Sequence, residues 1–211
     1  MSVTILLTGF GPFPGAPFNP TEAIVRKLAR ERRPALAGVT IVPHIFRTSY
    51  ASVDRELPAL LRKHKPDAML MFGLAQRTPH LRIETMARNA VAGMADADRK
   101  APRTRTIAKG KADTLALRTL ARPLLAEART ARVPAAVSRD AGRYLCNYLC
   151  WRATEAALEH DGPRLAAFIH VPLVRRGPVP ARRTKKRRLT MPDLAHAGRG
   201  FLRSIAAAAR R

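Results

Sequence analysis

The amino-acid sequence predicts an α/β sandwich built on a largely parallel β-sheet. Short apolar runs rich in Val, Ile and Leu alternate along the chain with longer segments whose apolar residues recur at helical spacing. Strands that alternate with helices form parallel sheets, because each helix carries the chain back to the edge where the next strand begins. The chain has 211 residues, of which 46% are hydrophobic. We therefore expect one domain with a sizeable core over residues 1–211.

The predicted strands are short and are bounded by turn residues. They span residues 4–7, 39–46, 68–72, 135–138 and 165–171. The run AMLMF at 68–72 is apolar throughout, which is typical of a strand covered by helices on both faces of a parallel sheet. In such a sheet, reactive groups gather on the loops at the carboxyl ends of the strands.

The predicted helices are recognised by apolar residues three and four positions apart. They span residues 21–30, 50–64, 112–128, 142–159 and 194–210. Thr190 and Pro192 stand just before the last of these segments, and both are typical of the start of a helix.

Net charge is the outlying property of this chain. The sequence holds 39 Lys and Arg residues against 15 Asp and Glu residues, a formal charge of +24. Such a field attracts nucleic acid, anionic lipid or acidic partners without any specific site. Residues 94–111 hold six of the basic residues and residues 175–190 hold eight. We expect both segments to be mobile loops of the same domain.

The cysteine content and the apolar runs indicate a compartment. Two cysteines cannot form a disulfide framework, and they favour a reducing environment. No apolar run is long enough to cross a bilayer, and the opening residues MSVTILLTGFGPFPG lack the basic region of a signal peptide. We expect a cytoplasmic protein that does not bind membranes.

Cys146 is the first candidate for chemistry. It follows a small-residue turn, Ala141-Gly142, at the start of a predicted helix, where the positive end of the helix dipole favours a thiolate. The alternative is a buried structural cysteine, since free cysteine is among the most buried residue types. Cys150, one turn later, is better explained as core. A CxxxC pair without a further Cys or an adjacent His is a poor zinc site, so we expect no bound metal.

Two further residues are candidates for acid–base chemistry. His170 ends the apolar strand at 165–171, where an α/β enzyme places a general base, although a hydrogen-bonded core histidine fits the same pattern. Glu84 lies between Arg82 and Arg88, which fits a salt-bridged surface residue. It also fits the acid that orients an imidazole in a catalytic triad, and spacing alone leaves both interpretations open.

Five short motifs occur in one order along the chain. They are GFGPF at 9–13, NPT at 19–21, ETMARN at 84–89, SRDAGRYLCN at 138–147 and FIHVP at 168–172. Together they resemble pyroglutamyl peptidase I, a cysteine peptidase family also called pyrrolidone-carboxylate peptidase. The resemblance spans residues 1–172, apart from the basic stretch after Met94.

The resemblance implies a fold, a reaction and a catalytic triad. The family has a three-layer α/β/α fold and removes an N-terminal pyroglutamyl residue from peptides. On its pattern, Cys146 is the nucleophile, His170 the general base and Glu84 the acid that orients the imidazole. No cofactor is implied, and the family often forms homo-oligomers, so self-association is one expectation for this chain.

The resemblance also implies a pocket for the five-membered lactam ring of the substrate. A flat, uncharged ring suits aromatic and apolar walls. The residues that correspond to this pocket are Phe10, Phe13, His44, Leu74, Tyr144 and Leu145. Leu74 stands where the family commonly has a glutamine, Met94 where it has an arginine near the oxyanion, and His44 where it often has a threonine.

These departures leave two other functions open. One is a thiol amidohydrolase that acts on a different amide, because selectivity for a lactam depends on hydrogen bonds that Leu74 and Met94 do not offer. The other is a basic protein that binds nucleic acid or other anions on a degraded peptidase scaffold. Aromatic residues make up only 5% of the chain, so base stacking is poorly provided for, and we interpret most of the charge as solvated surface.

Overall fold

A six-stranded sheet forms the centre of the molecule, and its order is β2-β1-β3-β8-β4-β7. The computed structural model describes residues 2–31, 34–175 and 188–211. The strands are β1 (Val3–Phe10), β2 (Val39–Phe46), β3 (Ala68–Leu74), β4 (Leu81–Glu84), β7 (Ala135–Ser138) and β8 (Leu165–Val171). All neighbouring pairs are parallel except β4 and β8, which run antiparallel. The predicted α/β fold with a mostly parallel sheet is confirmed.

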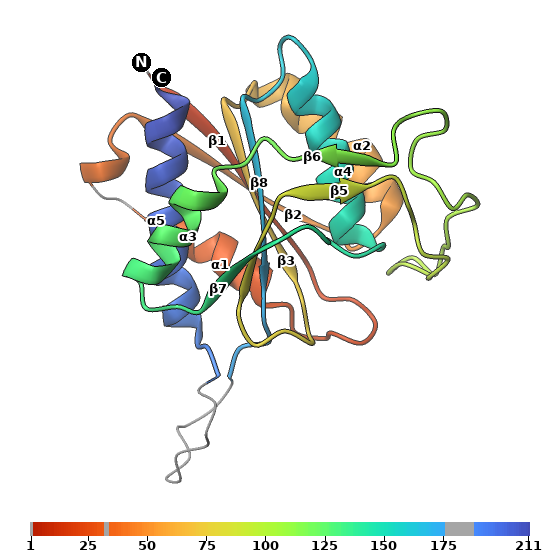
Figure 1. Cartoon of the computed structure of the whole chain (residues 1–211), viewed down its shortest axis with the longest axis horizontal. Coiled ribbons are helices and arrows are strands. Elements are labelled where there is room, and N and C mark those ends of the chain that lie inside the picture. Colours follow the sequence, from red (N-terminus) through yellow and green to blue (C-terminus); the bar gives the residue numbers. More distant parts are fainter. Residues whose placement is uncertain (1, 32–33, 176–187) are drawn as a thin grey trace, which may run out of the picture.

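Helices cover both faces of the sheet and make three layers (Figure 1). One layer holds α1 (Pro20–Ala29), α3 (Ala121–Thr130) and α5 (Met191–Ala209). The other holds α2 (Tyr50–His64) and α4 (Leu145–Leu158). A short 3-10 helix, η1 (Pro34–Leu36), precedes β2, and a two-stranded hairpin of β5 (Met86–Arg88) and β6 (Thr114–Ala116) lies against α4.

Strand alternation divides the apolar side chains into two cores, one on each face of the sheet. In β1, Ile5 and Leu7 pack with α1, α3 and α5, whereas Leu6 packs with α2 and α4. In β3, Leu70 belongs to the core under α1, α3 and α5, and Met71 belongs to the core under α2 and α4. Because both faces are covered, the central strands are apolar at almost every position, which is the pattern that made them recognisable in the sequence.

The regular elements agree closely with the sequence predictions. The strands at 39–46, 135–138 and 165–171 and the helix at 50–64 have the predicted bounds. Thr190 is the N-cap of α5, and its side chain and that of Asp193 form a reciprocal capping box. The helix therefore begins at the predicted start signals, three residues earlier than residue 194.

Two parts of the prediction are wrong. The predicted helix at 112–128 begins only at Ala121, because residues 114–116 pair with β5 as a strand instead. Strand β4 was not predicted. It has only four residues, and two of them, Arg82 and Glu84, are charged, so it lacks the apolar run that marks the other central strands.

The basic segment at 94–111 contains no helix or strand but is bonded to the rest of the domain. The Asn89 side chain accepts hydrogen bonds from the backbone N–H groups of Ile107 and Ala108, at 2.9 and 2.8 Å. The Ala97 N–H donates to the Thr48 carbonyl at 2.9 Å. The mobility predicted for this loop stays a prediction. Most of the second basic segment, residues 176–187, lies outside the described residues.

Across the described parts of the chain, no helix has both the length and the apolar character that spanning a membrane would require.

Candidate active site

Strand alternation brings two distant residues to the same face of the sheet. On β8, Phe168 packs in the core under α2 and α4, and His170 follows two residues later on the same face. On β4, Ile83 belongs to the opposite core, so the next residue, Glu84, faces α4. Because β4 runs antiparallel to β8 with Glu84 opposite Phe168, the carboxylate and the imidazole are neighbours.

Glu84 and His170 form a buried hydrogen-bonded pair. The His170 Nδ1 atom lies 2.8 Å from the Glu84 Oε1 atom. The side chain of Glu84 is fully buried and that of His170 is only 6% exposed. A bond of this kind fixes the orientation of the ring and leaves the other nitrogen, Nε2, for a second partner.

That second partner is Cys146, the second residue of α4. The connection from β7 ends at Tyr144, the N-cap of the helix, so the thiol lies within the first turn, where the helix dipole favours negative charge. A Cβ atom at Gly73 would lie only 2.8 Å from the Cys146 sulfur. The thiol therefore rests directly on β3 at a position that requires glycine.

The charge distribution favours an imidazolium beside the thiol. Burial alone lowers the pKa of His170, but the charge and hydrogen bond of Cys146 and those of Glu84 outweigh burial and raise it to about 9. Burial acts in the opposite direction on Glu84, yet the hydrogen bond and charge of His170 hold the pKa of that carboxyl below its usual value. The neighbouring Ser138 hydroxyl and the Arg82 charge act in the same direction as His170.

The two cysteines of α4 differ sharply. Cys146 is partly exposed, whereas Cys150 is fully buried in the core on the α2 and α4 side. Burial raises the pKa of the Cys150 thiol well above its usual value, so this thiol stays protonated. The prediction that Cys150 is a core residue is confirmed.

The Asn147 side chain links the Cys146 helix to the segment that follows Glu84. Asn147 follows Cys146 and is fully buried. It accepts a hydrogen bond from the Arg88 N–H at 2.8 Å and donates to the carbonyls of Arg88 and Ala90 at 2.8 and 3.0 Å. The nucleophile's helix is thereby locked to the segment that follows Glu84.

Two of the predicted pocket residues, Phe13 and Tyr144, are aromatic neighbours, and Tyr144 is the N-cap of the Cys146 helix. The ring centroids of Phe13 and Tyr144 lie 6.4 Å apart, and the Tyr144 hydroxyl donates to the Ala95 carbonyl at 3.0 Å. Burial, with the charges of Asp96 and Cys146, raises the pKa of Tyr144 to about 12, so the hydroxyl stays neutral. These two side chains are uncharged and aromatic, and their contact with a substrate stays a prediction.

Two others are core residues. Phe10 is 2% exposed and its ring centroid lies 6.0 Å from that of Phe46, while Leu145 is 1% exposed at the start of α4. Both lie in the core that includes Phe168. Their packing fixes the position of the loop and of the helix start, and contact with a substrate stays a prediction for each.

The pocket roles predicted for Leu74 and His44 stay predictions. Alternation along β3 directs Leu74 to the opposite face from Gly73. The His44 Nε2 atom lies 2.9 Å from the Glu56 Oε2 atom on α2. Met94, predicted at the position of an oxyanion arginine, is 58% exposed.

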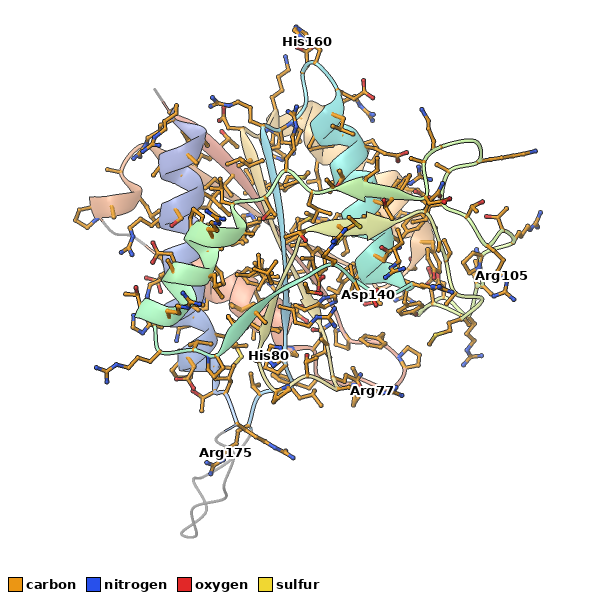
Figure 2. All side chains as sticks on the ribbon, in the orientation of Figure 1. Arg77, His80, Arg105, Asp140, His160 and Arg175 are labelled. Carbon is orange, nitrogen blue, oxygen red and sulfur yellow. The ribbon has the colours of Figure 1, made fainter. Side chains whose placement is uncertain are left out.

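The carboxyl end of the sheet carries other polar residues. Figure 2 shows Arg77, His80 and Arg175 beyond the ends of β3 and β8, whereas His160 lies at the opposite end of the molecule. Three residues that build the site were missed by the sequence reasoning: Gly73, Arg82 and Asn147. Gly73 stands out only as a glycine at the end of an apolar strand, and Asn147 only by its place after Cys146. The importance of Arg82 depends on pairing between strands, which spacing does not reveal.

A thiol at a helix start, next to an imidazole held by a buried carboxylate, is the arrangement found in cysteine hydrolases. A model of the pyroglutamyl peptidase family matches residues 3–208 of this chain. The pyrrolidone-carboxylate peptidase of Thermococcus onnurineus is 31% identical over 175 residues, which cover 81% of this chain and 84% of that protein. Pyrrolidone-carboxylate peptidase 1 of Ralstonia nicotianae is 34% identical over 174 residues, with coverages of 80% and 78%. The chain belongs to the pyroglutamyl peptidase family, whose members are cysteine peptidases.

Solved structures share the fold along nearly the whole chain. The pyrrolidone carboxyl peptidase of Fervidobacterium islandicum AW-1 matches with a TM-score of 0.85 and 24% identity, covering 98% of this chain and 99% of that chain. Pyroglutamyl peptidase I of Bacillus amyloliquefaciens matches with a TM-score of 0.83 and 24% identity, covering 97% and 96%. The predicted three-layer α/β/α architecture is therefore confirmed.

Proposed function

We propose that this protein is a cysteine peptidase that removes N-terminal pyroglutamyl residues from peptides. The observation that supports the proposal most strongly is the buried Glu84–His170 pair beside Cys146 in a chain of the pyroglutamyl peptidase family. A reactive thiol also fits a reducing compartment, and the cytoplasm is the location we propose.

The first half of the reaction forms an acyl-enzyme. His170, an imidazolium at neutral pH, holds the proton of the Cys146 thiol, and the thiolate sulfur attacks the carbonyl carbon that joins pyroglutamate to the next residue. Backbone N–H groups in the first turn of α4 point toward the negative charge that develops on the carbonyl oxygen. His170 then donates its proton to the leaving amine, and the C–N bond breaks.

The second half releases the product. Water adds to the thioester carbonyl while His170 accepts a proton from it, and the C–S bond breaks to free pyroglutamate. Glu84 remains ionised throughout and stabilises the imidazolium that forms in each half. The chain's own residues supply every proton transfer in this scheme.

The lactam is recognised chiefly by apolar contact. Phe13 and Tyr144 are the aromatic side chains next to the nucleophile, and a flat uncharged ring packs against such faces without burying charge. Phe10 and Leu145 support this wall from the core.

A second candidate is hydrolysis of a different small amide by the same thiol. It is favoured by Met94, which is exposed and apolar where the family has an arginine, and by Leu74, which lies on the face of β3 away from Gly73. A site with fewer polar partners for a lactam discriminates less strongly between amides.

A panel of fluorogenic amides tests both candidates. We expect the pyroglutamyl amide to be cleaved with a higher kcat/KM than aminoacyl amides, and Cys146→Ala and His170→Ala to abolish turnover. Cys150→Ser serves as the matched control, because this thiol is in the core. Wild-type turnover by Cys146→Ala would exclude the mechanism, and preference for another amide would favour the second candidate.

A further inference from the structure

Arg82 lies two residues before Glu84 on β4 and directly opposite His170 in the strand pairing. Its side chain shares the face of the sheet that carries both members of the buried pair. The Arg82 Nε atom is 3.2 Å from the Glu84 Oε1 atom, the same oxygen that lies 2.8 Å from His170 Nδ1. One carboxylate oxygen therefore contacts both a guanidinium and an imidazole.

The guanidinium is also hydrogen-bonded to the segment that leads to the nucleophile. Its Nε and Nη2 atoms donate to the Ser138 hydroxyl at 3.2 and 2.6 Å, and Nη2 also donates to the Asp140 carbonyl. Ser138 ends β7, and Asp140, labelled in Figure 2, lies on the connection from β7 to α4. Arg82 thus joins β4 and β7 to the chain that enters the Cys146 helix.

His170 and the Ser138 hydroxyl stabilise the charged form of the Glu84 carboxyl group, and Arg82 adds a further contribution. The Glu84 side chain is fully buried, and its second oxygen, Oε2, has no hydrogen-bond partner among the described residues. A buried carboxylate with an unsatisfied oxygen is prone to take up a proton or to rotate. A cation 3.2 Å away opposes both changes.

We propose that Arg82 is a positioning residue that keeps the Glu84 carboxylate ionised and directed at His170. The inference rests on the proposed function, because it assigns a task within the same catalytic site. Arg82 acts through Glu84 and does not itself touch the reacting atoms.

The other charged and titratable groups near Glu84 do not duplicate this role. From β8 the carboxylate faces His170, and from α4 it faces Cys146 through His170 and the protonated Cys150. From β5, Arg88 reaches the side chain of Asp140 at 3.4 Å, on the exposed side of the loop. Among these groups, Arg82 supplies the permanent positive charge on Glu84.

Alkylation of Cys146 by iodoacetamide as a function of pH tests the proposal on the full chain, with the modified cysteine located by mass spectrometry. The reagent reacts with the thiolate, which pairs with the His170 imidazolium, and Glu84 in turn stabilises that imidazolium. Arg82→Gln keeps a donor for Ser138 but removes the charge. We expect its alkylation rate at pH 6 to fall about tenfold, because an opposite charge within a few ångströms shifts the pKa of a carboxyl group by about one unit or more.

Two further variants separate charge from folding. Arg82→Lys keeps the positive charge and should restore most of the acid-side rate. Arg26→Gln removes an arginine charge from an exposed ion pair with Glu22, away from the site, and should follow the wild-type profile. A wild-type profile in Arg82→Gln, or a profile in Arg82→Lys as altered as that of Arg82→Gln, would overturn the proposal.

The alkylation assay does not depend on the substrate. If pyroglutamyl amides are not cleaved but the profile shifts as expected, the role of Arg82 stands and the proposed substrate is wrong. If the amides are cleaved but the profile of Arg82→Gln is unchanged, the proposed function stands and the inference about Arg82 is wrong.

Discussion

The described part of the chain contains two His–Glu pairs with almost the same geometry and very different surroundings. On β8 and β4, His170 and Glu84 are 2.8 Å apart, with side chains 6% and 0% exposed. On β2 and α2, His44 and Glu56 are 2.9 Å apart, with side chains 24% and 25% exposed. The first pair lies beside Cys146 and is braced by Arg82, while the second lies next to a surface arginine, Arg55.

The difference shows that a short His–Glu contact alone does not make a catalytic site. Water screens a pair at the surface, so its charges influence little beyond themselves. In the buried pair, the charge and hydrogen bond of Cys146, together with those of Glu84, are strong enough to reverse the effect of burial on the pKa of His170. Burial and a thiol partner, rather than distance, distinguish the two sites.

Glu84→Gln should have the largest effect on activity. An amide cannot stabilise the imidazolium, and loss of the orienting acid in a catalytic triad lowers kcat by about 10⁴-fold. Steady-state kinetics on a pyroglutamyl amide measures this. Glu56→Gln is the matched control and should retain nearly full kcat, so equal losses in the two variants would contradict the distinction drawn between the pairs.

The same two variants should differ in stability. Removing one partner from a buried ion pair costs about 3–5 kcal/mol, because a buried charge loses its partner. Removing one from an exposed pair costs about 0–1 kcal/mol. Urea unfolding at pH 7 compares the two free energies, and a larger loss for Glu56→Gln than for Glu84→Gln would show that the burial of the pairs does not govern their strength.

Gly73→Ala tests how closely the thiol rests on the sheet. The added methyl group would lie 2.6 Å from Phe168 Cζ and 2.8 Å from the Cys146 sulfur, so these groups must shift. Overpacking of this kind costs about 1–3 kcal/mol, and displacement of the sulfur should lower kcat/KM about tenfold or more.

Gly11→Ala is the matched control for this position. The nearest atom to its added methyl would be 3.7 Å away, an ordinary contact. We expect wild-type unfolding and kinetics for Gly11→Ala, and an equally harmless Gly73→Ala would show that the thiol is not held against β3.

The sequence was most informative where the structure is most regular. Strands β2, β7 and β8 and helix α2 have the predicted bounds, because apolar periodicity reports which faces are buried. Strand β4 escaped prediction because Arg82 and Glu84 point into the site, so half of its side chains lack the apolar signal. The strand that carries the candidate site residues is therefore the one that apolar periodicity does not reveal.

The site was predicted in outline from motifs rather than from spacing. The interpretation of Glu84 as salt-bridged to Arg82 is right about the contact, at 3.2 Å, but wrong about the surface, since Glu84 is fully buried. The position of Gly73 under the Cys146 sulfur was not foreseen, because β3 and the start of α4 are far apart in the sequence. The contact of Arg82 with Ser138 was not foreseen either, because β4 and β7 meet only through strand pairing.

Titration of His170 by NMR tests the central geometry most directly. Because the charged form is favoured by Cys146 and Glu84, the pKa should be raised to about 9, so the ring stays an imidazolium at neutral pH and loses its proton as the pH rises through that value. Removing either partner, in Cys146→Ala or in Glu84→Gln, should lower it. A pKa near the ordinary 6.5 in the wild type, unchanged in both variants, would show that the three side chains do not act on one another.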